Sequence, residues 1–155
     1  MVKGVFLRLY LRIRENEVEK SKAKLKKMNI DIIFQCLTKD CWRYGIQYDV
    51  VIKTEDYFIL KIFGRKKDVL IKYHRTALVF LEDYNRFLYE VNLNQAQKGI
   101  YITSGEFDFR KSNIFHHKIN IQDNIHFIKY QIGLHGTTQQ VFYKKKIKFF
   151  KYLEY

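Results

Sequence analysis

The sequence predicts one α/β domain in which helices flank a mixed central β-sheet. Its 155 residues are 47% hydrophobic, which suffices for one buried core and not comfortably for two domains. Apolar segments of strand length alternate with charged segments of helical period. A long helical segment also runs almost directly into a short apolar strand, as in an α/β crossover. No linker, repeat or break in composition divides the chain, so residues 1–155 are expected to form a single domain.

The first part of the chain is expected to contain a strand, a helix and a second strand. Residues 5–13 carry apolar side chains at alternate positions, which is the period of a strand, with a helix as the alternative. Residues 14–28 are charged and helix-favouring, with a thin apolar stripe. Residues 30–35 are largely apolar and are predicted to form the second strand.

Three further strands are predicted over residues 47–52, 57–63 and 68–73. Gly45 marks the turn before the first of them, and Gly64 ends the second. The polar residues between the first two strands are typical of a turn, so these strands are expected to form a hairpin.

A long helix is predicted over residues 77–95, with Gly99 shortly after its end. Residues 100–103 form a short apolar strand, and residues 125–128 are predicted as a further strand after a polar loop. The final segment, residues 141–155, interleaves lysines with aromatic residues. The order of helix, strands, long helix and strand is that of a mixed α/β domain.

The strong positive charge points to a polyanionic partner. The chain has 29 Lys and Arg against 16 Asp and Glu, a formal net charge of +13. A folded domain gains nothing from that much self-repulsion, so the charge favours nucleic acid as the partner. An AT-rich genome would explain both the absence of proline and the excess of lysine. This explanation weakens the charge as an argument for a polyanionic partner but does not remove it.

Several function classes lose their main support because their motifs are missing. The sequence has no phosphate-binding P-loop, dinucleotide fingerprint, nucleophile elbow or zinc-protease motif.

Cys36 and Cys41 are more consistent with unpaired thiols in a reducing cytosol than with a metal site completed by His116 and His117. No signal peptide and no apolar run of about 18 residues is visible, so the protein is expected to be soluble and cytoplasmic.

A carboxylate and a lysine on neighbouring predicted strands form the main candidate site. Asp49 opens one strand, and Lys61 lies twelve residues later on the next. If the two strands form a hairpin, these side chains meet on one face of it. A carboxylate can bind Mg²⁺ and a lysine can orient or activate water, which is the minimum for phosphodiester hydrolysis.

At this point the sequence resembles the PD-(D/E)xK nucleases, whose core has the order αβββαβ with an Asp opening one strand and a Lys on the next. Residues 96–107 (AQKGIYITSGEF) look like the helix-to-strand passage of the Mrr-type restriction endonuclease branch. Residues 25–33 resemble the end of that family's first helix and its first strand, and residues 125–128 sit where the branch has its closing strand. The resemblance implies a restriction-endonuclease-like core over about residues 14–132.

The resemblance also implies roles for individual residues. Asp49 matches the metal-binding and catalytic Asp, and Lys61 matches the catalytic Lys. The position two before that lysine is Ile59, where the family has Glu, Asp or Gln, so Mg²⁺ would lose one of its side-chain ligands. The site is therefore expected to be inactive, or completed by an acid from a helix. The candidate helix acids are Glu82, Asp83 and Glu90, and also Glu15 and Glu19.

Two basic segments are candidates for phosphate contacts. Arg65, Lys66 and Lys67 follow the strand of Lys61 and would lie near the mouth of the site. The C-terminal lysines lie among aromatic residues, a mixture that suits single-stranded or irregular nucleic acid. The alternative is a basic strand that packs Phe149 and Tyr152 onto the core. The C-terminal lysines in question are Lys144, Lys145, Lys146 and Lys148.

Taken together, the sequence favours a nucleic-acid-binding protein of nuclease fold, with DNA preferred over RNA as the partner. If active, it would be a Mg²⁺-dependent endodeoxyribonuclease with an incomplete or rearranged site. One alternative is a catalytically inactive DNA-docking module of a restriction, repair or mobile-element system. Another is a structural RNA-binding or ribosome-associated protein from an AT-rich genome. Nucleases of this fold often act as dimers, so the resemblance leaves a homodimer open.

Overall fold

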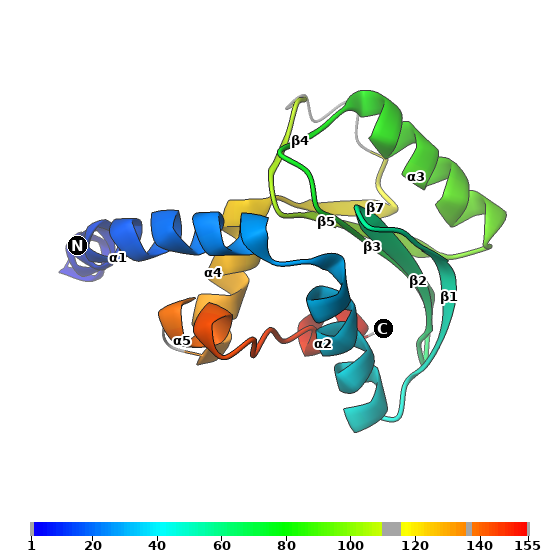
Figure 1. Cartoon of the computed structure of the whole chain (residues 1–155), viewed down its shortest axis with the longest axis horizontal. Coiled ribbons are helices and arrows are strands. Elements are labelled where there is room, and N and C mark those ends of the chain that lie inside the picture. The colour runs from blue at the N-terminus through cyan, green and yellow to red at the C-terminus, as the bar shows by residue number, and fades with distance from the viewer. Residues whose placement is uncertain (1, 110–115, 136–137, 155) are drawn as a thin grey trace.

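A five-stranded mixed β-sheet, with helices on both faces, forms the centre of the molecule (Figure 1). The computed structural model describes residues 2–109, 116–135 and 138–154. In Figure 1, α3 covers one face of the sheet, while α2 and α4 lie on the other. The prediction of a mixed α/β fold with a helix-flanked sheet is confirmed. No helix in the described part of the chain is long and apolar enough to cross a membrane.

The sheet has the order β1-β2-β3-β5-β7. β1 (Gln47–Lys53), β2 (Tyr57–Phe63) and β3 (Asp68–His74) form an antiparallel meander. β5 (Lys98–Thr103) pairs parallel to β3, and β7 (Ile119–Gln122) pairs parallel to β5. The three strands of the meander match the predicted strands to within one residue at each end.

The remaining strands, β4 (Leu78–Val79) and β6 (Glu106–Phe107), pair parallel in a small second sheet. The helices, in chain order, are α1 (Val2–Lys27), α2 (Ile30–Arg43), α3 (Leu81–Leu93), α4 (Asn124–His135), α5 (Thr138–Tyr143) and the 3₁₀ helix η1 (Phe150–Leu153). α1 packs against α4 and α5, and its N-terminal end extends away from the sheet (Figure 1).

The strand predicted over residues 5–13 is wrong, because this segment belongs to α1. The alternative of a helix was the correct one. Leucine and arginine dominate the segment and have high helix propensity, and no proline interrupts the passage into the predicted helix at residue 14. The alternation of apolar residues was therefore outweighed by helix propensity and continuity.

The strand predicted over residues 30–35 is also wrong, because α2 begins at Ile30. Asn29 caps the helix, and its side-chain oxygen accepts a hydrogen bond from Ile32 N at 3.0 Å. The apolar pattern continues beyond residue 35 with the period of a helix, which a short window does not reveal. The buried apolar residues of α2 are Ile30, Ile33, Leu37 and Cys41.

The closing strand of the sheet is β7, and the strand predicted over residues 125–128 is wrong. Residues 125–128 lie in α4 instead. The carboxylate of Asp123 accepts a hydrogen bond from His126 N at 2.9 Å, which satisfies a free donor in the first turn of this helix. The strand of residues 100–103 is confirmed within β5, and the long helix is confirmed but is shorter than residues 77–95, since it begins at Leu81.

Two hydrophobic cores lie on opposite faces of the sheet, since successive strand residues point to opposite faces. On β2, Phe58, Leu60 and Ile62 point into the larger core beneath α2 and α4, while Ile59 points into the smaller core beneath α3. Aromatic side chains supply much of the fully buried volume.

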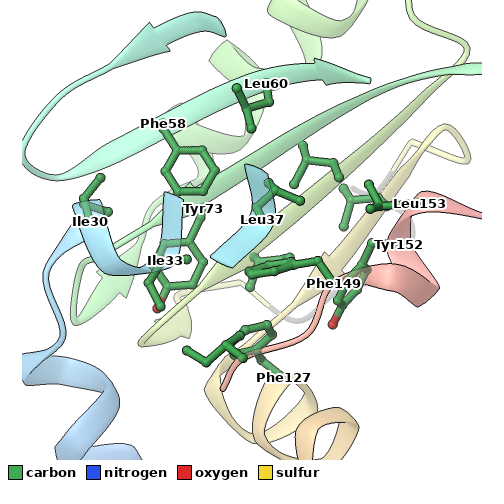
Figure 2. Close-up of a cluster of buried hydrophobic side chains, with 14 of the residues drawn as sticks. Ile30, Ile33, Leu37, Phe58, Leu60, Tyr73, Phe127, Phe149, Tyr152 and Leu153 are labelled. Atoms are coloured by element: carbon green, nitrogen blue, oxygen red, sulfur yellow. The ribbon is translucent and has the colours of Figure 1, made fainter. Parts of the chain in front are cut away.

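The C-terminal segment completes the larger core. Figure 2 shows Phe149 between Leu37 of α2 and Phe127 of α4, with Tyr152 beside it. The amide of Phe149 donates a 2.6 Å hydrogen bond to the buried carboxylate of Asp40, which ties this segment to α2. Phe149 and Tyr152 therefore pack on the core, as the alternative for this segment predicted, but they do so at the 3₁₀ helix η1 and not in a strand.

Candidate functional site

Asp49 and Lys61 are direct partners across the β1–β2 ladder, so the predicted hairpin does bring their backbones together. The side chains have different surroundings. The Lys61 ammonium donates a 2.8 Å hydrogen bond to the carbonyl of Asn94, the C-cap of α3, and lies 5.2 Å from the centre of the Phe63 ring. A cation at this point is favoured by the negative end of the helix dipole. No salt bridge joins Asp49 to Lys61, both of which the structure describes.

The acidic residues predicted to share a metal ion lie in different places. Asp49 is exposed and lines a hollow of about 530 Å³ together with Trp42 and Phe63. Glu90 lines a separate hollow of about 280 Å³, and Glu82 is exposed in the first turn of α3. Within residues 2–109, 116–135 and 138–154, no three His, Cys, Asp or Glu side chains gather into a group that could hold a metal ion.

Ile59, where the sequence departs from the nuclease motif, has a structural role. Ile59 is only 3% exposed and belongs to the core beneath α3, so this position is filled by apolar packing. Asp49 therefore has no second acidic ligand from β2. The residues around Asp49 do not fit Mg²⁺, which prefers several oxygen ligands in near-octahedral geometry.

Cys36 and Cys41 are free thiols on α2, in agreement with the preferred interpretation of two unpaired cysteines. The Cys36 thiol donates to the carbonyl of Lys145 at 3.4 Å. Burial, together with the charge of Asp40, raises the pKa of Cys41 to about 12, so this thiol stays protonated and unreactive.

Lys72 is a functional candidate that the sequence analysis missed. It lies in the middle of β3, is only 4% exposed, and faces Ile59 on β2 and Tyr101 on β5. Its ammonium lies 4.5 Å from the centre of the Tyr57 ring and 4.8 Å from that of Tyr101. Contacts of this kind stabilise a cation that has lost its water.

Burial disfavours the charged form of Lys72. Burial lowers the pKa of Lys72 to about 8, with a smaller contribution from Arg86, while Asp83 and Glu90 act in the opposite direction. Lys72 also lines the hollow of about 280 Å³ between β1, β2 and α3, along with Arg86 and Glu90. The signal for this residue was present in the sequence, since a lysine surrounded by strand-forming apolar residues is costly to bury without compensation.

A half-buried histidine and a buried tyrosine continue this polar row along the sheet. His74 Nδ1 and the Tyr101 hydroxyl are joined by a 2.8 Å hydrogen bond. Burial, assisted by the charge of Lys72, lowers the pKa of His74 to about 4 against the opposing effects of Asp83 and Asp56. Burial raises the pKa of Tyr101 well above its ordinary range. His74 and Tyr101 are therefore both neutral at pH 7.

The predicted basic residues after β2 lie at the end of the sheet. Arg65, Lys66 and Lys67 form the exposed turn between β2 and β3. Arg65 and Lys66 line a second hollow of about 530 Å³, which also includes Tyr44 and Phe150. The two predicted site residues Asp49 and Arg65 thus border different hollows at the same end of the molecule.

The C-terminal lysines are accessible, but their aromatic neighbours are largely used in the core. Lys144, Lys145 and Lys146 are exposed, whereas Lys148 is half-buried. The side-chain amide of Gln131 holds the backbone at Lys148 through hydrogen bonds of 2.8 and 2.9 Å. Because Phe149 and Tyr152 are buried, they cannot stack on bases as the sequence pattern suggested.

Tyr143 is 78% exposed beside Lys144, and a second group of exposed aromatic side chains lies at the corner where α2 leads into β1. Trp42, Tyr44 and Phe63 are 80%, 49% and 37% exposed. We call these three residues, together with Arg65 and Lys66, the aromatic corner. Large apolar residues at adjacent exposed positions are typical of binding surfaces. The sequence analysis missed this surface because its aromatic residues come from two separate segments.

Comparisons with family models, curated proteins and solved structures give no match to this chain.

Proposed function

We propose that this protein binds nucleic acid through the aromatic corner and through Lys67, which continues the basic turn between β2 and β3. The observation that carries the proposal is the position of Arg65 and Lys66, which line a hollow at the end of the sheet beside exposed aromatic residues. Basic side chains contact phosphates, and exposed aromatic rings contact bases or sugars. The formal net charge of +13 supports a polyanion as the partner of this surface.

The local charge balance supports the same assignment. Arg65, Lys66 and Lys67 are exposed in one turn, and Arg43 lies half-exposed at the end of α2. Two acids, Asp49 and Glu154, also line the two hollows. Arg43 pairs with Asp40, so the exposed turn of Arg65, Lys66 and Lys67 supplies the positive charge that attracts a phosphate backbone there.

The buried residues around the strand lysines favour binding of nucleic acid without cleavage. The family that the sequence resembles has Glu, Asp or Gln two positions before its strand lysine. Lys61 and Lys72, the lysines inside β2 and β3, each have an apolar residue at that position, Ile59 before Lys61 and Leu70 before Lys72. Ile59 is 3% exposed and Leu70 is fully buried. We therefore propose a DNA-docking module of nuclease-like fold, with RNA as the alternative ligand.

A metal-dependent endonuclease is the second candidate, because Asp49 and Lys61 are direct partners in the ladder. It requires Mg²⁺ and a further acid supplied when substrate binds. Plasmid cleavage with Mg²⁺ or Mn²⁺ separates the two candidates. Cleavage that is lost in Asp49→Ala and Lys61→Ala would favour the nuclease, whereas intact plasmid with full binding favours the docking module.

The binding proposal is tested by measuring the affinity for fluorescently labelled DNA over a range of salt concentrations. We expect the logarithm of the binding constant to fall linearly with the logarithm of salt, by roughly 0.9 for each phosphate contacted. Replacing Arg65, Lys66 and Lys67 together by Ala should reduce that slope by roughly 2 to 3.

A matched control removes the same charge elsewhere. Lys20, Lys26 and Lys27 are exposed on α1, and the last two precede α2, whereas the aromatic corner follows it. Replacing these three lysines by Ala should leave most of the salt dependence in place. Equal losses in the two triple variants would show that only the total charge matters, and unchanged binding in the first would place the contact surface elsewhere.

A further inference from the structure

The aromatic corner has a rigid backbone. Gly45 adopts a φ of +63°, a left-handed conformation that reverses the chain between α2 and β1. The amide of Ile46 donates to the carbonyl of Cys41 at 2.8 Å, and the amide of Tyr44 donates to that of Asp40 at 3.1 Å. The last turn of α2 is thus closed by hydrogen bonds, so the residues it carries are presented in fixed positions.

Two hollows adjoin at this corner. Each has a volume of about 530 Å³, and both are lined by Gly45, Ile46 and Phe63. Trp42 borders one hollow, and Tyr44 borders the other. The shared residues form the ridge between the hollows, with an exposed aromatic side chain on either side of it. Volumes of this size fall in the range of ligand-binding sites.

The basic residues at the hollow of Tyr44 fit an anionic chain. Arg65 and Lys66 line the hollow of Tyr44 together with the acid Glu154, and Asp49 lines the hollow of Trp42. The basic side chains are exposed and can follow a phosphate backbone. Apolar ring faces next to basic side chains are the arrangement that binds single-stranded nucleic acid.

We infer that the aromatic corner binds unpaired bases of a single-stranded nucleic acid, with Trp42 and Tyr44 stacking on bases in the two hollows. This inference rests on the proposed function and specifies its ligand. The bases of a duplex are stacked on one another, so their faces are closed to protein side chains. Unpaired bases expose those faces and can be taken up by aromatic residues. Arg65 and Lys66 then hold the phosphates that link the bases.

Trp42 is the only tryptophan of the chain, so selective excitation of tryptophan reports on this corner alone. The experiment titrates the full-length protein with a thymidine oligonucleotide and, separately, with a duplex of the same length at fixed salt. A labelled copy of each ligand gives the affinity by anisotropy in parallel. We expect the single strand to quench Trp42 emission on binding and the duplex to leave it nearly unchanged.

The variant Trp42→Ala should weaken single-strand binding by roughly 5- to 100-fold, as expected for the loss of one stacked base. Its affinity for the duplex should stay within about twofold. Tyr89→Ala is the matched control, because Tyr89 is 63% exposed on α3 and lies outside both hollows. This control should bind both ligands as the wild type does. Since Trp42 is 80% exposed, its replacement removes little packing.

The outcomes separate the inference from the proposed function. Single-strand binding without quenching, and unaffected by Trp42→Ala, would overturn the inference and leave the proposed function standing. Equal quenching by the duplex would overturn the preference for unpaired bases. Failure to bind either ligand in dilute salt would overturn both proposals.

Discussion

Lys72 and Tyr101 are direct partners on β3 and β5, and the Lys72 ammonium lies 4.8 Å from the centre of the Tyr101 ring. Tyr57 supplies a second ring at 4.5 Å from the same ammonium. Ring faces attract a cation less strongly than the water it has given up, so this lysine carries a free-energy cost in the folded state.

Replacing Lys72 by Met should therefore stabilise the protein at pH 7. Met has a similar length and no charge, and the gain in the free energy of unfolding should be about 1–3 kcal/mol. The pKa of Lys72 falls from its ordinary value of 10.5 to about 8, so the unfolded chain binds more protons than the folded chain between these values. The cost of Lys72 is full below pH 8 and disappears as the pH rises toward 10.5.

The measurement is urea unfolding of wild type and Lys72→Met at pH 7 and pH 9.5. The difference in free energy of unfolding between the two proteins should shrink at the higher pH. In the folded protein, His74 and Tyr101 on the sheet are neutral at both pH values, and Asp83 and Glu90 on α3 are present in both proteins. The exposed Lys66→Met should change stability by less than about 0.5 kcal/mol at both pH values. A loss of stability in Lys72→Met would contradict the prediction.

Acid should destabilise the protein through His74. Burial and the charge of Lys72 lower its pKa from 6.5 to about 4. Between these pH values the unfolded chain therefore binds a proton at this histidine and the folded chain does not. The free energy of unfolding should fall by up to about 3 kcal/mol as the pH decreases from 6.5 to 4. His74→Gln should lose this component, while His117→Gln, at an exposed position, should keep it. Parallel pH profiles for wild type and His74→Gln would refute this assignment.

Gly105 lies where the chain passes closest to the segment before β4. A Cβ at this position would lie 2.1 Å from the carbonyl oxygen of Thr76 and 2.3 Å from that of Ala77. Because both contacts are with backbone, Gly105→Ala should destabilise the protein by about 2 kcal/mol or more. The control is Gly133→Ala on the exposed side of α4, where a Cβ meets nothing within 4 Å. It should stabilise the helix by about 0.5–1 kcal/mol, and thermal melting compares the two.

The buried carboxylate of Asp40 should contribute far more to stability than a surface acid of the same helix. Asp40 is 2% exposed and accepts the hydrogen bond of Phe149 N, so Asp40→Ala leaves a buried donor without a partner. The expected loss is about 2–3 kcal/mol. Asp31 on the same helix pairs with Lys53 at the surface, and Asp31→Ala should cost less than about 1 kcal/mol. Similar losses in urea unfolding of the two variants would contradict this argument.

The central meander could be predicted from the sequence because each strand is bounded by turn residues. Gly45 and Gly64 flank the first two strands, and apolar residues alternate between two buried faces. The pairing of Asp49 with Lys61 followed from the expected hairpin. The same local patterns were misleading in the segments of residues 5–13, 30–35 and 125–128, which are short apolar stretches of helices whose period extends beyond them.

The functional surfaces were harder to predict because they depend on tertiary contacts. Lys61 was expected to meet Asp49, but the end of α3 offers it the carbonyl of Asn94, more than thirty residues away in sequence. Trp42 and Phe63 share a hollow only because Gly45 turns β1 back beside the end of β2. No single sequence window contains such a contact.

The hydrogen bond from Phe149 to Asp40 joins residues 109 positions apart, and this separation has a consequence for folding. Closing so long a loop costs conformational entropy before any contact compensates for it, so docking of residues 147–153 is expected after the sheet and α2 have formed. Until then, Leu37 and Phe127 lack the covering ring of Phe149 on an otherwise assembled sheet face. This intermediate is the species most exposed to aggregation during refolding, and tighter docking of the segment would protect against it.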